Sequence, residues 1–232
     1  MKKALTIILM ALSTYVMADA YTGIAVNSGN STGTDQLMGK LYLTKDLGDG
    51  WGFNEQLKYY YNDNTFQQFK SFDAPTGPFF QDGVLDSNTM LTYNYGNGWF
   101  TTVGYRGFGY LDAGQFSDRQ ELTNGFANKI TEDLSQSTYL SLFRYSDNSY
   151  KVAVENDIHY DIGHGFSFDT NLAFYEVKNT FVVDSTFTVD PLIQLNYNFT
   201  KNTSIYISQE MVRAFDSDKS SNITEVGFGT TW

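Results

Sequence analysis

The residues best suited to acid–base chemistry are few and lie close together. The chain has two histidines, His159 and His164. Asp157, His159 and Asp169 could meet across neighbouring strands, but no nucleophile is evident beside them. There is no cysteine, which excludes thiol and Cys–metal chemistry. We therefore predict no catalytic site, no metal site and no cofactor, and we do not expect an enzyme.

A second group of charged residues falls on the polar face of alternating segments, since successive side chains of a strand point to opposite faces. The group consists of Lys40, Lys58, Arg106, Lys129, Glu155, Asp157, Asp169, Glu210 and Glu225. The basic members precede the acidic members along the chain. A closed barrel would place the two sets on opposite walls across water and create a transverse field. We predict that all nine line a pore; the alternative is a chance distribution over a polar wall.

The segments that position these residues alternate between apolar and polar residues. They are separated by five short turns and six longer connections, as in hairpins of a membrane barrel with short periplasmic turns and longer outer loops. We predict an all-β transmembrane antiparallel barrel of twelve strands, with ten as the alternative. The predicted strands are 21–26, 36–45, 51–61, 88–95, 99–110, 121–130, 136–145, 150–162, 166–177, 186–199, 203–214 and 222–232. In this register Glu55 falls on the lipid face, and 62–87 is a long outer loop.

Composition agrees with a membrane barrel. The mean hydropathy is −0.33, although 41% of residues are hydrophobic, as expected where only alternate strand residues face lipid. Aromatic residues reach 17% and gather beside the short turns, for example at Trp51, Trp99, Phe166 and Trp232. Such positions predict an interfacial girdle, which a soluble sandwich would not need. The net charge of −11 excludes nucleic acid as a partner, because phosphates would be repelled.

The first residues predict export. Met1–Lys3 is basic, 4–12 is apolar, and Ala18-Asp19-Ala20 has the form of a cleavage site. We predict a signal peptide over 1–20, removed after Ala18 or Ala20, and a barrel over 21–232. The final segment, 222–232, alternates and ends on Trp232, which is typical of the closing strand that barrel-assembly machinery recognises. The predicted location is the outer membrane of a Gram-negative cell.

The turn Leu47-Gly-Asp-Gly-Trp-Gly52, together with the chain length and strand count, resembles the small monomeric porins of the oligogalacturonate-specific porin family. The resemblance implies a passive channel. That family has arginine-rich lumens, whereas this chain has only four arginines, at 106, 119, 144 and 213, so no binding residue is carried over. We predict a monomeric porin for small polar solutes, plausibly sugars or oligosaccharides, in contact with outer-membrane lipid and lipopolysaccharide. The alternative is a non-conducting barrel that acts as an adhesin or structural anchor.

Overall fold

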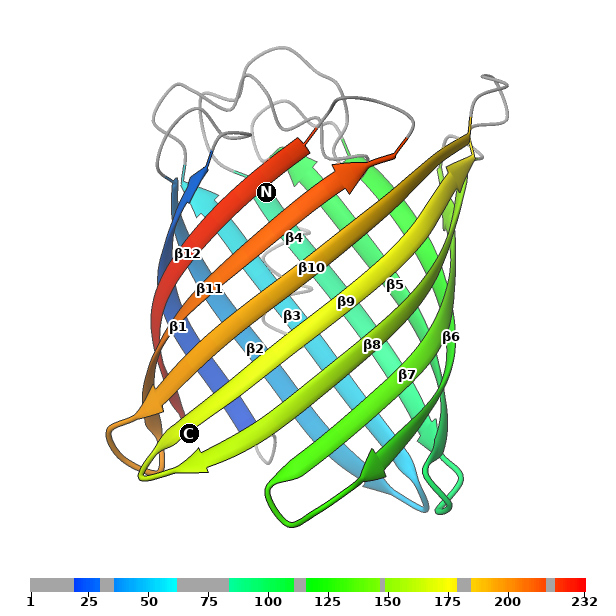
Figure 1. Ribbon diagram of the computed structural model, residues 1–232. Coiled ribbons are helices and arrows are strands. Elements are labelled where there is room, and N and C mark those ends of the chain that lie inside the picture. Colours follow the sequence, from blue (N-terminus) through cyan, green and yellow to red (C-terminus); the bar gives the residue numbers. More distant parts are fainter. Residues whose placement is uncertain are drawn as a thin grey trace, which may run out of the picture.

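The chain forms a closed barrel of twelve antiparallel strands (Figure 1). The computed structural model describes residues 19–29, 36–61, 84–110, 116–146, 149–178, 185–215 and 220–232. Within these residues no helix has the length and apolar character needed to cross a membrane. The predicted signal peptide, apart from Asp19 and Ala20, lies outside the described residues. The predicted count of twelve strands is confirmed.

The strands follow one another around the barrel in chain order. Their bounds are β1 Asp19–Gly29, β2 Gln36–Gly48, β3 Trp51–Tyr61, β4 Val84–Asn94, β5 Trp99–Tyr110, β6 Phe116–Lys129, β7 Leu134–Tyr145, β8 Tyr150–Gly163, β9 Phe166–Lys178, β10 Ser185–Asn198, β11 Thr203–Ala214 and β12 Ser220–Thr231.

The barrel closes because β1 pairs with both β2 and β12. Ile24 lies opposite Phe228 of β12 and opposite Gly39 of β2. The backbone N–H of Trp232 donates to the carbonyl of Ala20 over 2.7 Å and extends this seam. A closed ladder leaves no edge strand, which is the condition that a β structure must meet in lipid.

Five short turns join the strands at one end of the barrel, at the bottom of Figure 1. In two of them a Gly-X-Gly sequence makes the chain reverse with positive φ at all three residues. Gly48, Asp49 and Gly50 have φ of 83°, 51° and 83°, and His164 between its two glycines has φ of 55°. Glycine adopts this conformation without steric cost, and aspartate is among the residues that tolerate it best.

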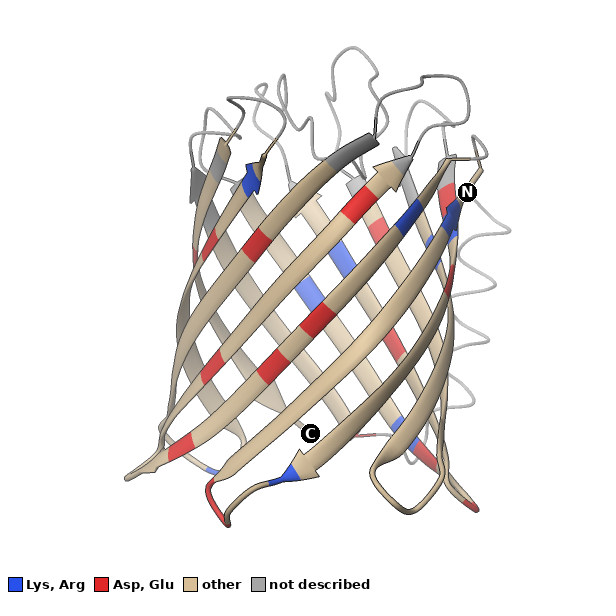
Figure 2. Ribbon diagram, turned by 45° about the vertical axis from the view of Figure 1, so that its right-hand side comes forward, with Lys and Arg blue, Asp and Glu red and all other residues tan. Residues whose placement is uncertain are grey.

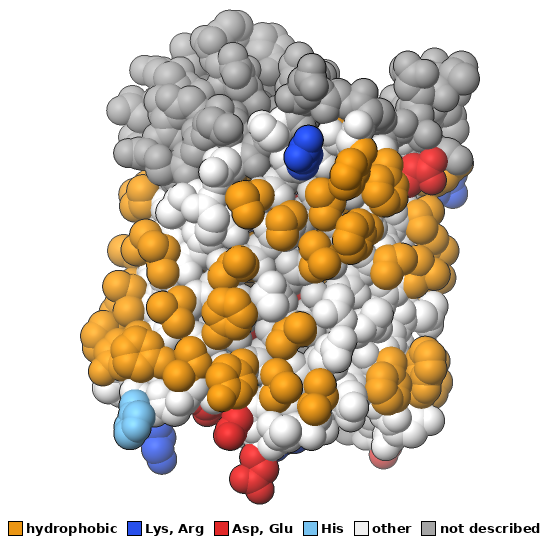
Figure 3. Space-filling model, in the orientation of Figure 1, with side chains coloured by type: hydrophobic (Ala, Val, Ile, Leu, Met, Phe, Trp, Pro, Cys, Tyr) orange, Lys and Arg blue, Asp and Glu red, His pale blue; other side chains and the backbone are white. Residues whose placement is uncertain are grey.

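The outer face is apolar and the inner face is polar. On β1, Ile24 is 61% exposed, whereas its neighbour Ala25, which points inward, is 2% exposed. The same alternation recurs along the other strands, and apolar side chains are spread over the wall shown in Figure 3, with other side chains and backbone between them. Aromatic pairs lie beside the short turns, including Trp51–Tyr93, Trp99–Phe126 and Phe166–Tyr197. This is the distribution expected of a wall that faces lipid with an interfacial belt.

Two strands begin four or more residues earlier than their predicted bounds. β4 begins at Val84 rather than at residue 88, so the predicted loop over 62–87 was too long; residues 62–83 lie outside the described part. β6 begins at Phe116 rather than at residue 121. Both extensions add charged residues to the barrel wall, namely Asp86, Asp118 and Arg119.

Candidate pore wall

All nine predicted pore residues lie on strand positions whose side chains share the inward face. Lys40 and Lys58 are cross-strand partners, as are Lys58 and Asp86, so β2, β3 and β4 carry one continuous charged row. Glu155, Asp157 and Asp169 form a second row on β8 and β9, and Glu210 and Glu225 lie on β11 and β12. Figure 2 shows several acidic positions along the front strands, and both basic and acidic positions on the strands behind them.

One ion pair of this wall joins Lys40 to Glu225. The Lys40 ammonium donates to the Glu225 carboxylate and, over 2.6 Å, to the Tyr206 hydroxyl, which itself donates to Glu225. The Lys40 and Glu225 side chains are only 9% and 16% exposed. β1 lies between these two strands, so Lys40 reaches across it. Its direct partner on β1 is Gly23, whereas Glu225 lies opposite Asn27, so the Lys40 side chain crosses β1 diagonally.

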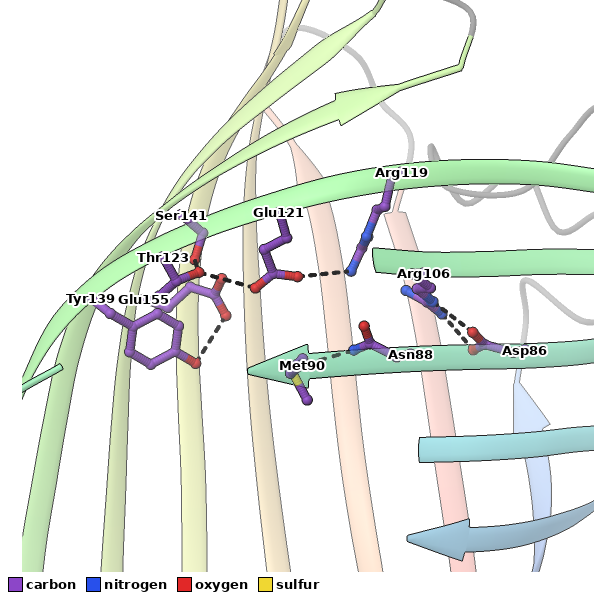
Figure 4. Close-up of polar contacts among 10 residues, drawn as sticks. All are labelled: Asp86, Asn88, Met90, Arg106, Arg119, Glu121, Thr123, Tyr139, Ser141 and Glu155. Atoms are coloured by element: carbon purple, nitrogen blue, oxygen red, sulfur yellow. Dashed lines mark hydrogen bonds and ion pairs between the residues drawn. The ribbon is translucent and has the colours of Figure 1, made fainter. Parts of the chain in front are cut away.

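Arg106 is held by Asp86 in a bidentate ion pair. Its Nε and Nη2 atoms donate to the two carboxylate oxygens over 2.7 and 2.6 Å, and the Asp86 side chain is 4% exposed. Such fork-on-fork geometry fixes a guanidinium more firmly than a single contact does. Figure 4 shows Arg106 turned toward Asp86 on the neighbouring strand.

A further polar row runs along β6 and β7 (Figure 4). Arg119 lies 4.0 Å from Glu121, Glu121 accepts from Thr123, and Thr123 is 2.7 Å from Ser141. The Arg119 guanidinium also lies 4.6 Å from the centre of the Phe143 ring. On the other side of Phe143, Lys151 lies 3.9 Å from the Tyr175 ring centre. Charge on this part of the wall is thus held against aromatic rings as well as carboxylates.

The acidic residues of β8 and β9 are held by uncharged donors and one histidine. Tyr139 donates to Glu155 over 3.2 Å, and Asn171 donates to Asp157 over 2.5 Å. Asp169 accepts from Asn196 over 2.5 Å and lies 2.6 Å from Nδ1 of His159. Within the described strands, no lysine or arginine forms an ion pair with these three carboxylates.

These contacts correct the expectation of two opposed charged walls. Lys40 and Glu225 were expected to face each other across water, but they are in direct contact at the seam. Arg106 is neutralised by Asp86 on its own side, and Glu121 also lies on the predicted basic side. Within the described strands, the row on β8 and β9 forms no ion pair with lysine or arginine, and neither Lys58 nor Lys129 forms one with a carboxylate.

Lys129 lies near the short turns, in the same cross-strand row as His159 and Asp169, two of the residues considered for acid–base chemistry. Lys129, Ser135, His159 and Asp169 are successive cross-strand partners on β6 to β9. This arrangement falls short of a catalytic triad, because no hydrogen bond between Ser135 and His159 is found in the described part of the chain. The His159 and Asp169 side chains are also 50% and 36% exposed, and the strand amides that could stabilise an oxyanion are used in the ladder.

The sequence analysis missed several residues of this wall. Asp86 and Arg119 lie in segments predicted to be loops, and Tyr139 was not among the predicted pore residues. Arg119 could have been placed on the inward face of β6 from the sequence. Every second residue of this segment is polar, namely Ser117, Arg119, Glu121 and Thr123. No comparable signal identified Tyr206, whose hydroxyl donates to Glu225 on the neighbouring strand β12.

Comparison with known proteins gives relatives in fold only. No family model matches the chain, and no curated protein matches it in sequence. Among solved structures, the NanC porin gives a TM-score of 0.60 at 10% identity, covering 90% of this chain and 98% of that one. The KdgM porin in complex with disordered oligogalacturonate gives 0.56 at 11% identity, covering 91% and 99%.

A third similar structure is the COG4313 outer membrane channel from Pseudomonas putida F1. It gives a TM-score of 0.54 at 13% identity and covers 93% of this chain and 94% of that one. All three resemble this chain over nearly its whole length, and all are named as porins or channels. The chain therefore has the fold of the small twelve-stranded outer-membrane porins, as the resemblance noted in its sequence implied.

Proposed function

We propose that this protein is an outer-membrane channel for the passive diffusion of small polar solutes, with sugars or short oligosaccharides as the plausible cargo. The observation that carries the proposal is the contrast between the two faces of one wall. Apolar side chains point outward, whereas the inward positions carry charged, amide and hydroxyl groups. A barrel whose interior is polar holds water rather than a packed core. We also propose that the protein is a monomer and has no enzymatic activity.

The proposed lumen has a weak preference for cations. Acidic side chains outnumber basic ones at the inward positions of the described strands. The acidic ones are Asp86, Glu121, Glu155, Asp157, Asp169, Asp190, Glu210 and Glu225, and the basic ones are Lys40, Lys58, Arg106, Arg119, Lys129 and Lys151. Since several of these charges are paired, the remaining field is small.

The proposed surroundings follow from the outer face. The apolar wall contacts outer-membrane lipid, and the rim contacts lipopolysaccharide. Insertion would depend on barrel-assembly machinery, because the closed ladder must form in the membrane. Localisation of the protein in outer-membrane fractions of a Gram-negative host tests this part directly.

Liposome swelling tests the channel proposal. The protein, refolded into liposomes, is diluted into isotonic solutions of neutral sugars of increasing size. Swelling rates that rise with protein and fall steeply with sugar size are expected of a diffusion pore. A lack of swelling with the smallest sugar, in liposomes shown to contain folded protein, would contradict the channel and favour a non-conducting anchor.

A further inference from the structure

A recess in the inner wall lies across β6 to β10, toward the end with the short turns. Its cavity of about 540 Å³ is lined by Ser137, Asp157, His159, Asp169 and Asn171, among others. That volume lies within the range of small-molecule sites. Aromatic and hydrogen-bonding groups lie beside the recess, so it offers a ligand more than charged side chains.

Two aromatic side chains, Phe100 of β5 and Tyr139 of β7, lie beside this recess, and the Tyr139 hydroxyl contacts Asn171 of its lining. Gly125 of β6 lies between them, and a Cβ there would come within 2.4 Å of the Phe100 ring and 2.6 Å of the Tyr139 Cβ. The glycine therefore allows the Phe100 ring to lie over the wall, with its centre 6.3 Å from that of Tyr139. Both rings are half-buried, so part of their apolar surface remains open to the lumen.

The polar part lies next to Tyr139. Its hydroxyl donates to Glu155 and accepts from Asn171 over 3.5 Å, and Asn171 also donates to Asp157. A carboxylate has about four acceptor positions, so Glu155 and Asp157 retain acceptors after these contacts. Neighbouring hydroxyl groups on a sugar ring can donate to such acceptors, while the C–H face of the ring packs on an aromatic side chain.

The charge of the recess selects between kinds of sugar. Glu155, Asp157 and Asp169 form no ion pair with lysine or arginine in the described strands, and Lys129 is the one lysine among the residues that line the recess. A sugar acid in the recess would bring its carboxylate close to three others with a single lysine of the lining to offset them, and at low ionic strength this repulsion disfavours binding. A neutral sugar meets no such repulsion and can use the same acceptors.

We propose that this recess, lined by Asp157, Asp169 and Asn171, forms a binding subsite for neutral saccharides together with Phe100, Tyr139 and Glu155 beside it, and that the subsite discriminates against acidic saccharides. The inference deepens the proposed channel function, on which it rests, by naming the class of solute. It assigns the aromatic pair to contact with the sugar ring and the carboxylates to its hydroxyl groups.

Calorimetric titration of the folded barrel in detergent tests the subsite without requiring conductance. The probes are maltotriose, which is neutral, and trigalacturonate, which is acidic. We expect maltotriose to bind about tenfold more tightly at low ionic strength, a difference of about 1.4 kcal/mol. Equal binding of the two probes, tighter binding of trigalacturonate, or no binding of either would overturn the subsite. Swelling of liposomes in such a case would leave the channel proposal standing.

Two variants locate the binding. Phe100→Ala should weaken maltotriose binding about tenfold through loss of ring contact, whereas the control Phe126→Ala removes the same side chain from the outer face of β6.

Asp157→Asn keeps the shape of the wall and should bring the affinities for maltotriose and trigalacturonate closer by roughly threefold or more. Its control, Asp133→Asn, lies in an exposed turn. If Phe100→Ala does not fold, Asp157→Asn still decides, because an unchanged ratio of affinities would refute the proposal.

Discussion

Lys40 of β2 and Glu225 of β12 form an ion pair across β1, the strand that lies between them. The contact therefore spans three strands at the seam where the two ends of the sheet meet. Tyr206 joins the pair through hydrogen bonds to both groups. Backbone pairing alone closes the ladder, and this side-chain contact adds a second connection over the same seam.

Removing one partner of this pair should destabilise the barrel more than removing both. Lys40→Met leaves the largely buried Glu225 carboxylate with Tyr206 as its remaining partner, and we expect a loss of about 2 kcal/mol in the free energy of unfolding. Lys40→Met with Glu225→Gln should recover part of that loss. Urea unfolding of the refolded protein measures both, and the exposed Lys129→Met is the control. A double variant as unstable as the sum of its singles would contradict a direct interaction.

Gly227 lies against the ring of Tyr206 and should not tolerate a side chain. A Cβ at Gly227 would come within 2.2 Å of the Tyr206 ring, so Gly227→Ala should cost about 1–3 kcal/mol through overpacking. Gly39→Ala is the matched control, because a Cβ there meets nothing within 4 Å. The comparison is made by unfolding in urea. If both glycine variants are equally stable, Tyr206 does not lie where the structure places it.

Much of this fold could be predicted from the sequence, because alternation and tight-turn residues are local signals. These signals predict the number of strands and the residues that face inward, and they place Glu55 on the outer wall. The partners of individual charges could not be predicted in the same way. Lys40 meets Glu225 only because the first and last strands pair, which brings β12 within reach of β2 across β1. Asp86 was missed because its strand begins directly after a long polar segment.

Glu55 is a charged residue on the lipid-facing wall. Its carboxylate accepts hydrogen bonds from Ser87 over 3.0 Å and from Thr89 over 2.5 Å, which offsets part of the cost of that position. Charges on this face remain unfavourable by up to a few kcal/mol, although less so for acidic residues. Glu55→Leu should raise the free energy of unfolding in lipid bilayers by about 1 kcal/mol. A clear loss of stability would show that the carboxylate has a stabilising role.

Trp232 should affect assembly more than the finished barrel. Its side chain is 75% exposed and contributes one hydrogen bond, from Nε1 to Thr22 over 3.0 Å, whereas its backbone contact with Ala20 does not need the indole. Trp232→Ala should therefore lower the amount of protein in the outer membrane. Refolded variant should still migrate differently on gels before and after boiling, as a closed barrel does. Normal amounts in the membrane would argue against this role.

Reversal potential in a planar bilayer under a salt gradient tests the central claim, a water-filled channel with an acidic bias, most directly. We predict stable ohmic steps with weak cation preference, which fades toward 1 M salt as the Debye length falls to about 3 Å. Lys58→Gln should strengthen the preference, and Glu210→Gln with Asp157→Asn should weaken or invert it. Absence of conductance, or clear anion selectivity of the unaltered protein, would contradict the account.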